Sequence, residues 1–209
     1  MNKFLTFLRA PILDKYNFLR LLFYRVKTKV LYKWLFCGVG SKTTIFKPIL
    51  LIGVDNISIG NNVLIRDGVR LETHEQGSIV IEDGVSIEQS CNFTSTGNLF
   101  IGKDVTISFD VMITNIDHEY QNIGQPILQQ PNIIIDTYIS ENCFIGSGAK
   151  IQAGTHLGKQ CIVGANSVVR GVFPDYCVIV GAPAKIVKRF NPTTTLWEKV
   201  NSDGSFKNE

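Results

Sequence analysis

The sequence predicts a mainly-β protein built as a stacked, triangular coil of short parallel strands, and three observations lead to this prediction. An apolar, mostly aliphatic, side chain recurs every six residues over most of the chain. A small or β-branched residue follows four places after many of these positions, and turn formers such as Gly60, Asn61 and Asp83 fill the intervals. This period matches neither the 3.6-residue repeat of a helix nor the alternation of a single strand.

The six-residue repeat runs without interruption through one long tract and in shorter bursts before it. The long tract comprises Ile133, Ile139, Ile145, Ile151, Leu157, Val163 and Val169, and the bursts are Ile59, Ile65, Leu71, then Ile81, Ile87, Phe93, then Ile101, Ile107, Ile113. A triangular coil explains the spacing, because three six-residue sides complete a turn and each repeated residue points into the prism. Coils stacked at ~4.8 Å would satisfy one another's backbone groups.

The residues four places after the repeated positions suit the crowded corners of such a coil. They are Val63, Val69, Val85, Cys91, Val105, Val111, Thr137, Cys143, Ala149, Thr155, Cys161 and Ser167. Three of the five cysteines occupy this position, so we interpret them as core residues. The odd number of cysteines and the lack of a CxxC pair favour reduced thiols and a cytoplasmic location.

We expect three segments along the chain. Residues 1–47 form a basic N-terminal helical segment, residues 48–172 form the coil with a projecting loop at 114–132, and residues 173–209 form a C-terminal strand, turn and tail. Residues 1–47 hold ten lysines and arginines against one acid, Asp14. The net charge of this segment is therefore +9 and that of the remainder is −6, within a total of +3.

Residues 13–36 lack glycine and proline and mix apolar residues with lysine and arginine, which favours a helix. Such a helix either caps the open end of the coil or lies on the inner membrane surface, where Trp34, Phe36 and the basic residues would meet anionic lipid. Both interpretations stay open here. The sequence contains neither an apolar run of membrane-spanning length nor a signal-peptide pattern. Nucleic acid is not an expected partner, because no recognition motif accompanies the charge.

Two stretches of the repeat and one stretch after its end resemble the hexapeptide-repeat acetyltransferases, and above all the O-acetyltransferases of bacterial surface polysaccharides. They are residues 145–151 (IGSGAKI), 163–169 (VGANSVV) and 181–185 (GAPAK), within a resemblance that covers roughly residues 48–190. The resemblance implies a left-handed parallel β-helix, a homotrimer, acetyl-CoA as donor and active sites at the subunit interfaces.

The longest break in the repeat, from Ile113 to Ile133, predicts a loop that projects from the coil. This loop contains His118, and an imidazole is suited to take a proton from a hydroxyl at neutral pH. Residues 115–120 (NIDHEY) resemble the Asp-His loop of the polysaccharide O-acetyltransferases, which assigns His118 as the general base. Asp117 is expected to orient the imidazole, with Glu119 or a backbone carbonyl as alternatives.

Two asparagines are candidates for binding the acceptor. Asn92, followed by Phe93, resembles an asparagine–phenylalanine pair that contacts the acceptor in galactoside acetyltransferases, although a turn asparagine explains it equally well. Asn115 lies in the loop beside the proposed base. His74 and His156 are expected to be surface residues.

By resemblance, Ser147 and Ala165 match positions that contact CoA, and Arg170 lies where the family has polar contacts to the same ligand. Ordinary turn chemistry would also explain the small residues. Lys185 and Lys188 follow Pro183 and are expected to bind the CoA phosphates, with a solvated basic C-terminus as the alternative.

The resemblance therefore implies an acetyl-CoA-dependent O-acetyltransferase that acts on a saccharide hydroxyl in bacterial surface-glycan biosynthesis, without a metal. One alternative is an N-acyltransferase of an amino sugar, and another is a non-catalytic β-helix scaffold. A metal enzyme of the carbonic-anhydrase type is disfavoured, because the three histidines are spaced too widely to form its ligand set.

Overall fold

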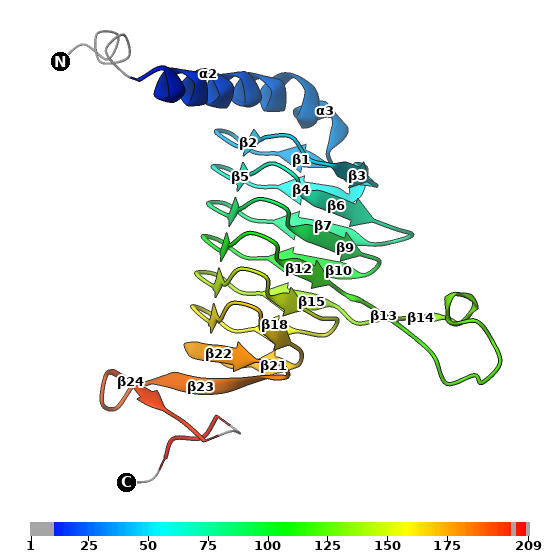
Figure 1. Cartoon of the computed structure of the whole chain (residues 1–209), viewed down its shortest axis with the longest axis vertical. Coiled ribbons are helices and arrows are strands. Elements are labelled where there is room, and N and C mark those ends of the chain that lie inside the picture. Colours follow the sequence, from blue (N-terminus) through cyan, green and yellow to red (C-terminus); the bar gives the residue numbers. More distant parts are fainter. Residues whose placement is uncertain (1–10, 202–203, 208–209) are drawn as a thin grey trace.

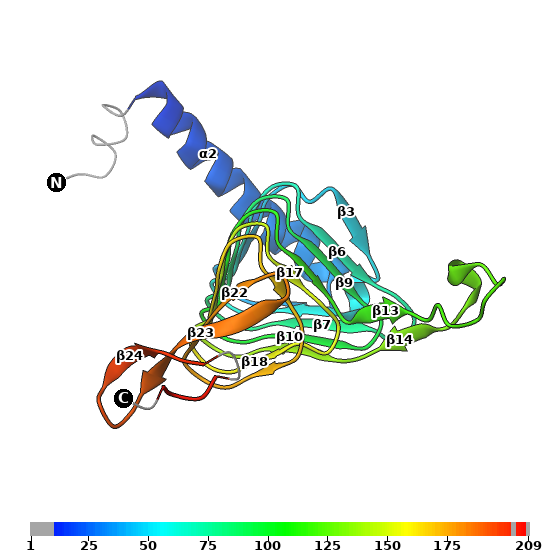
Figure 2. The same ribbon diagram turned by 60° about the horizontal axis from the view of Figure 1, so that its bottom comes forward.

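The computed structural model describes residues 11–201 and 204–207, which form a parallel β-helix with a helix across one end (Figure 1). Three parallel sheets make up the sides of the coil, and its cross-section is triangular when the molecule is turned toward its axis (Figure 2). The predicted mainly-β coil of parallel strands is confirmed.

Each sheet takes one strand from nearly every coil. The first sheet contains β1 (Gly38–Val39), β4 (Ile57–Ile59), β7 (Ser78–Ile81), β10 (Asn98–Ile101), β15 (Thr137–Ile139), β18 (His156–Leu157) and β21 (Val172–Phe173). The second contains β2 (Thr44–Ile45), β5 (Leu64–Ile65), β8 (Ser86–Ile87), β11 (Thr106–Ile107), β16 (Phe144–Ile145), β19 (Ile162–Val163) and β22 (Cys177–Gly181). The third contains β3 (Leu50–Ile52), β6 (Arg70–Thr73), β9 (Asn92–Ser95), β12 (Met112–Thr114), β17 (Lys150–Ile151) and β20 (Val168–Val169).

The repeated apolar residues form the core of the prism, as the six-residue period predicts. Every repeated position except Ile133 is buried, and so is every small or β-branched residue four places later. The prediction for Ile133 is wrong. It lies half-buried in β14 (Asn132–Ile134), which pairs antiparallel with β13 (Ile116–His118) outside the coil. The coil resumes only at β15, where Ile139 pairs with Ile101.

The C-terminal end of the second sheet is extended by antiparallel strands. β22 pairs with β23 (Ala184–Asn191), and β23 pairs with β24 (Leu196–Lys199). Two short 3-10 turns complete the secondary structure, Val54–Asn56 between the first and second coils and Ile127–Gln129 at the tip of the projecting loop.

The N-terminal helix covers the first coil. α2 (Ile12–Lys27) continues through a π-helical turn (Thr28–Tyr32) into α3 (Lys33–Leu35). Tyr32 and Phe36 belong to the buried core, and the Thr28 hydroxyl accepts a hydrogen bond of 2.9 Å from the Ile45 backbone N–H. This segment therefore closes the open end of the prism. No helix in the described part of the chain is long and apolar enough to cross a bilayer.

Candidate active site

The projecting loop is fixed to the coil by Asn115. The side chain of Asn115 is fully buried: its Oδ1 accepts from the Thr96 N–H at 2.9 Å, and its Nδ2 donates to Ser95 Oγ at 2.8 Å. Its backbone carbonyl accepts from the Ile135 N–H at 3.0 Å, on the returning strand of the loop. The Asn115 side chain therefore holds the root of the loop, and its contact with the acceptor stays a prediction.

Asp136 fixes the other side of the loop root. Its Oδ1 accepts from the Asn98 N–H at 2.7 Å, and its Oδ2 accepts from Asn98 Nδ2 at 2.9 Å and from the Tyr138 hydroxyl at 3.2 Å. These hydrogen bonds lower the pKa of the Asp136 carboxyl. A charged Asp136 and a buried Asn115 together set the direction in which the loop leaves the coil.

His118 ends the outgoing strand of this loop. In the β13–β14 hairpin, Ile116 pairs with Ile134 and His118 pairs with Asn132. The hairpin projects from one corner of the triangular section, well clear of the sheets (Figure 2). The His118 side chain is exposed, and the described residues make no side-chain hydrogen bond to its imidazole. His118 is therefore available to a substrate.

One face of the hairpin and the outer face of the third sheet enclose a groove of about 610 Å³. Its lining is almost entirely polar and consists of His74, Glu75, Thr94, Thr96, Thr114, Ile116, His118 and Asn132. Thr94 and Thr114 lie side by side on β9 and β12. Hydroxyl, imidazole and amide groups that converge in a cleft of this size suit a ligand rich in hydroxyls.

His74 is a groove residue that the sequence did not single out. It was expected to be a surface residue, and its imidazole is indeed partly exposed, 3.3 Å from Glu72 Oε2. Glu72 itself is buried and also forms an ion pair with Arg70. The contact between the Glu72 carboxylate and Nε2 fixes the His74 ring in the groove that His118 also lines. Thr94 and Thr114 each follow a repeated apolar residue, Phe93 and Ile113, by one place. This spacing is the sequence signal that could have revealed the polar outer face of the third sheet.

The other face of the hairpin borders a second groove, of about 490 Å³. Asp117, His118, Tyr120, Gln121, Ile127, Ile133 and Arg170 line it. The Asp117 carboxylate forms an ion pair with the Arg170 guanidinium, which comes from the end of β20. The structure therefore joins Asp117 to Arg170 and does not bring it to the His118 imidazole. His118 is the residue common to the two grooves.

The expected donor positions Ser147 and Ala165 lie at a different corner from Arg170, between the second and third sheets. Ser147 and Ala165 stack on successive coils, where Asn166 N–H donates to the Ser147 carbonyl at 2.9 Å. A side chain at Gly146 would come within 2.6 Å of the Ala165 nitrogen, so only glycine fits there. The stripe thus presents small residues and backbone groups along the coil axis.

Lys185 and Lys188 continue this stripe. Gly164, the residue before Ala165, packs against Val180, because a Cβ at Gly164 would lie 2.8 Å from that side chain. The C-terminal end of β22 therefore follows Ala165 in the next coil. Val180 pairs with Lys185 on β23, and Val178 pairs with Lys188. Both lysines are exposed. A long anionic ligand along the stripe would therefore meet positive charge at its far end.

Of the expected donor positions, a single chain brings only Arg170 to a groove that His118 lines. Neither groove at His118 contains Ser147, Ala165, Lys185 or Lys188 in its lining. Asn92 also lies outside both linings, and its side-chain amide donates to the Ser90 carbonyl at 3.2 Å, as a turn asparagine does.

The grooves contain no thiol. Cys91, Cys143, Cys161 and Cys177 are buried in the prism, and Cys37 is exposed near the N-terminal helix. Burial raises the pKa of the Cys91 thiol to about 11, so this group is neutral at physiological pH. Within residues 11–201 and 204–207, no group of three or more His, Cys, Asp and Glu side chains is placed to hold a metal ion.

Comparison with known proteins gives one family profile and clear relatives. Residues 136–171 match the family described as "Bacterial transferase hexapeptide (six repeats)". The chain is 35% identical over 152 residues to the "Putative lipopolysaccharide biosynthesis O-acetyl transferase WbbJ" of Escherichia coli K12, covering 69% of this chain and 77% of that protein. It is 32% identical over 155 residues to an Escherichia coli dTDP-4-amino-4,6-dideoxy-D-glucose acyltransferase, covering 72% and 80% of the two chains.

Among solved structures, a mutant of AntD, an N-acyltransferase from Bacillus cereus, shares the fold. That crystal structure is in complex with dTDP-4-amino-4,6-dideoxyglucose and coenzyme A. It superimposes with a TM-score of 0.68 at 19% identity, over 80% of this chain and 90% of that chain.

Proposed function

The chain belongs to the hexapeptide-repeat acyltransferases, and we propose that it transfers an acetyl group from acetyl-CoA to a hydroxyl of a saccharide. The observation that carries the proposal is the polar groove beside His118. The exposed imidazole of His118 lines this groove of about 610 Å³ together with three threonines, His74 and Asn132. A sugar presents many hydroxyls, and such a lining offers a donor or an acceptor to each of them.

His118 acts as the general base in this proposal. Its free imidazole nitrogen takes the proton of the acceptor hydroxyl as the oxygen attacks the thioester carbon. A backbone N–H at the site stabilises the oxyanion that forms. When the carbon–sulfur bond breaks, CoA leaves as the thiolate and takes the proton from the imidazolium. The enzyme returns to its starting state, and one ester has replaced one thioester.

The donor lies along the stripe of Ser147 and Ala165 in our proposal. Small side chains let the pantetheine amides approach the backbone of successive coils, and Lys185 and Lys188 meet the phosphates. Arg170 lines the groove on the other side of His118, and in our proposal it contacts the reactive end of the donor. Its ion pair with Asp117 holds the guanidinium there, so Asp117 acts by positioning Arg170.

We propose that the site is completed by a second copy of the chain within a homotrimer. His118 projects from one corner of the prism, whereas the donor stripe lies at another. Three prisms around a common axis would place the stripe of one beside the hairpin of the next. The same packing would exclude water from the thioester.

The acceptor class is tested by product analysis. Purified protein and acetyl-CoA are incubated with neutral hexoses, oligosaccharides and nucleotide-linked amino sugars, and CoA release is followed before the products are analysed by mass spectrometry. We expect a base-labile ester on a saccharide hydroxyl. A base-stable amide formed on the amino sugar, by contrast, would place this protein with the sugar N-acyltransferases among its relatives.

Replacing Lys185 and Lys188 by alanine is expected to raise the KM for acetyl-CoA about tenfold with little change in kcat, because charge-assisted contacts to phosphate are lost. Removing one phosphate from the donor supplies a second readout. The wild type should prefer acetyl-CoA to acetyl-dephospho-CoA, and the double variant should discriminate less. The exposed Lys103, on a turn of another coil, provides the control Lys103→Ala. An equal effect of this control would place the phosphates away from β23.

A further inference from the structure

The N-terminal helix has two faces of opposite character. Tyr24, Thr28 and Tyr32 face the first coil, where Tyr24 packs on Phe46 with the ring centroids 5.0 Å apart. The opposite face carries a line of apolar residues at intervals of three or four, which places them on one side of a helix. We call this line the apolar stripe; it consists of Tyr16, Leu19, Phe23, Val26, Val30 and Trp34.

Every side chain of the apolar stripe is more than half exposed. Phe23 is 62% exposed and Trp34, at the C-terminal end, is 83% exposed. Isolated apolar residues are common on protein surfaces, but a continuous line of this length is characteristic of a binding surface. The helix lies across the end of the coil, so its outward face extends over the molecule's N-terminal surface (Figure 1).

The borders of the apolar stripe are positively charged. Lys15, Lys29 and Lys33 follow one border at helical spacing. Lys27 lies on the other side, where its ammonium packs over the rings of Tyr24 and Tyr32. The described part of the helix contains one acid, Asp14. The surface next to the stripe is therefore attracted to negative charge.

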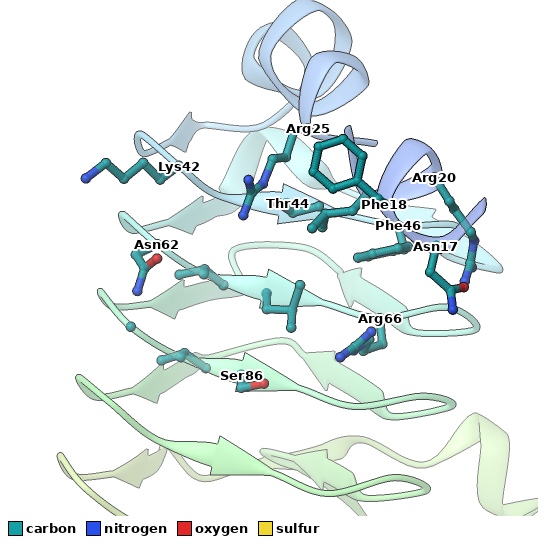
Figure 3. Close-up of a pocket in the computed structure, with 15 residues that line it drawn as sticks. Asn17, Phe18, Arg20, Arg25, Lys42, Thr44, Phe46, Asn62, Arg66 and Ser86 are labelled. Atoms are coloured by element: carbon teal, nitrogen blue, oxygen red, sulfur yellow. The ribbon is translucent and has the colours of Figure 1, made fainter. Parts of the chain in front are cut away.

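The groove beneath the helix adds to this positive field. It has a volume of about 730 Å³ and lies between α2 and the outer face of the second sheet (Figure 3). Arg20 there is ion-paired with Asp67, and Arg66 lies 3.5 Å from Glu88. Arg25 points from the helix toward the sheet at the other side of the groove, and Lys42 lies at the same side with its side chain directed outward (Figure 3). Among the described residues, no acid forms an ion pair with either of them.

We propose that the outward face of the N-terminal helix binds an anionic membrane surface. The apolar stripe would enter the boundary between headgroups and acyl chains, and the lysines along its border would meet lipid phosphates. Arg25 and Lys42, in the groove beneath the helix, would add to the long-range attraction. This inference goes beyond acetyl transfer and does not rest on it. From the sequence, residues 13–36 are interpreted either as a cap of the coil or as a membrane-surface helix. In this proposal the helix is both, because one face packs on the coil and the opposite face binds lipid.

A second copy of the chain fits this face less well than a lipid surface does. Two helices paired through the apolar stripe would bring the lysines of both copies together. Asp14 is the one acid in the described part of each helix that could offset them. Like charges held together across an interface oppose association, whereas anionic headgroups neutralise the same lysines.

The test is co-sedimentation of the full chain with vesicles of phosphatidylcholine, alone or mixed with phosphatidylglycerol. We expect binding to the mixed vesicles at low ionic strength and weaker binding in high salt, where charges are screened. Lys29→Gln with Lys33→Gln should weaken the partition coefficient about 25-fold, at roughly a factor of five per charge. Phe23→Ser with Trp34→Ser should weaken it at least as much, since two aromatic side chains no longer enter the membrane.

Matched controls remove equally exposed groups far from the helix. Leu196→Ser with Val172→Ser controls for the apolar change, and Lys103→Gln with Lys199→Gln controls for the charge; both pairs should bind as the wild type does. Equal binding by the stripe variants and the controls would overturn the proposal. So would a smaller oligomer for the Phe23→Ser, Trp34→Ser variant in sedimentation velocity without lipid, which would make the stripe a protein interface. Vesicle binding needs no acceptor, so its outcome is independent of the proposed enzyme activity.

Discussion

Replacing His118 by alanine is expected to lower kcat for acetyl transfer by about 100-fold or more, with the affinity for acetyl-CoA little changed. The imidazole is exposed at the junction of the two grooves, and the hairpin that carries it is held by Asn115 and Asp136 at its root. Removing the ring therefore removes the base without disturbing the coil. Steady-state kinetics and direct binding of acetyl-CoA measure the two effects separately.

His156→Ala is the matched control for this variant. His156 is exposed on β18, lines neither groove, and contacts the Tyr138 ring at 4.8 Å between centroids. Its replacement should leave kcat within a few-fold of the wild type. If His118→Ala is also within a few-fold, the base is another residue, and His74 is the next group to replace because it lines the same polar groove.

Mixing two inactive variants is expected to restore activity, which tests the shared site. His118→Ala lacks the proposed base, and Ala165→Trp fills the proposed donor stripe with a large side chain. Each variant alone should turn over at least about 100-fold more slowly than the wild type. If the chain forms the proposed homotrimer, unfolding and refolding the two variants together produces mixed trimers. A site built from the hairpin of one chain and the stripe of its neighbour should then be intact at about one quarter of the interfaces.

The comparison that interprets this experiment is a mixture made without refolding. If subunits do not exchange, that mixture stays inactive while the co-refolded sample gains activity. A co-refolded sample with no gain, or a monomer that turns over at the full rate, would show that one chain supplies the whole site.

The coil could be predicted because its rule is local. Each repeated residue meets the same neighbours, one coil before and one coil after, so a fixed spacing specifies a fixed environment. Ile133 shows where this reasoning fails. It precedes Ile139 by six residues, but its strand pairs with β13 instead of the coil, and spacing alone does not distinguish the two. Ile45 shows the converse, since it is fully buried in the first coil although it was not counted among the repeats.

The site was predicted only in part, since it depends on residues brought together by the stacking. His118 stood out because it lies in the longest break of the repeat. Asn115 lies in the same break, yet its side chain turns inward, and nothing in the order of residues distinguishes an inward from an outward amide. His74 and His118 line the same groove although two coils and part of the loop separate them in the sequence. Asp117 and Arg170 form an ion pair although they lie 53 positions apart.

The loop leaves the coil in a way that allows the sequence of the loop and the sequence of the coil to change independently. β10 pairs directly with β15, Leu99 beside Thr137, so the sheet passes beneath the loop without a gap. The hairpin satisfies its own backbone in a separate two-stranded ladder. Residues 119–131 can therefore lengthen, shorten or diverge at little cost to the prism, as long as Asn115 and Asp136 keep the root. Selection for a new acceptor can therefore change the loop tip, while the apolar repeat is conserved by the separate need to fill the core of the coil.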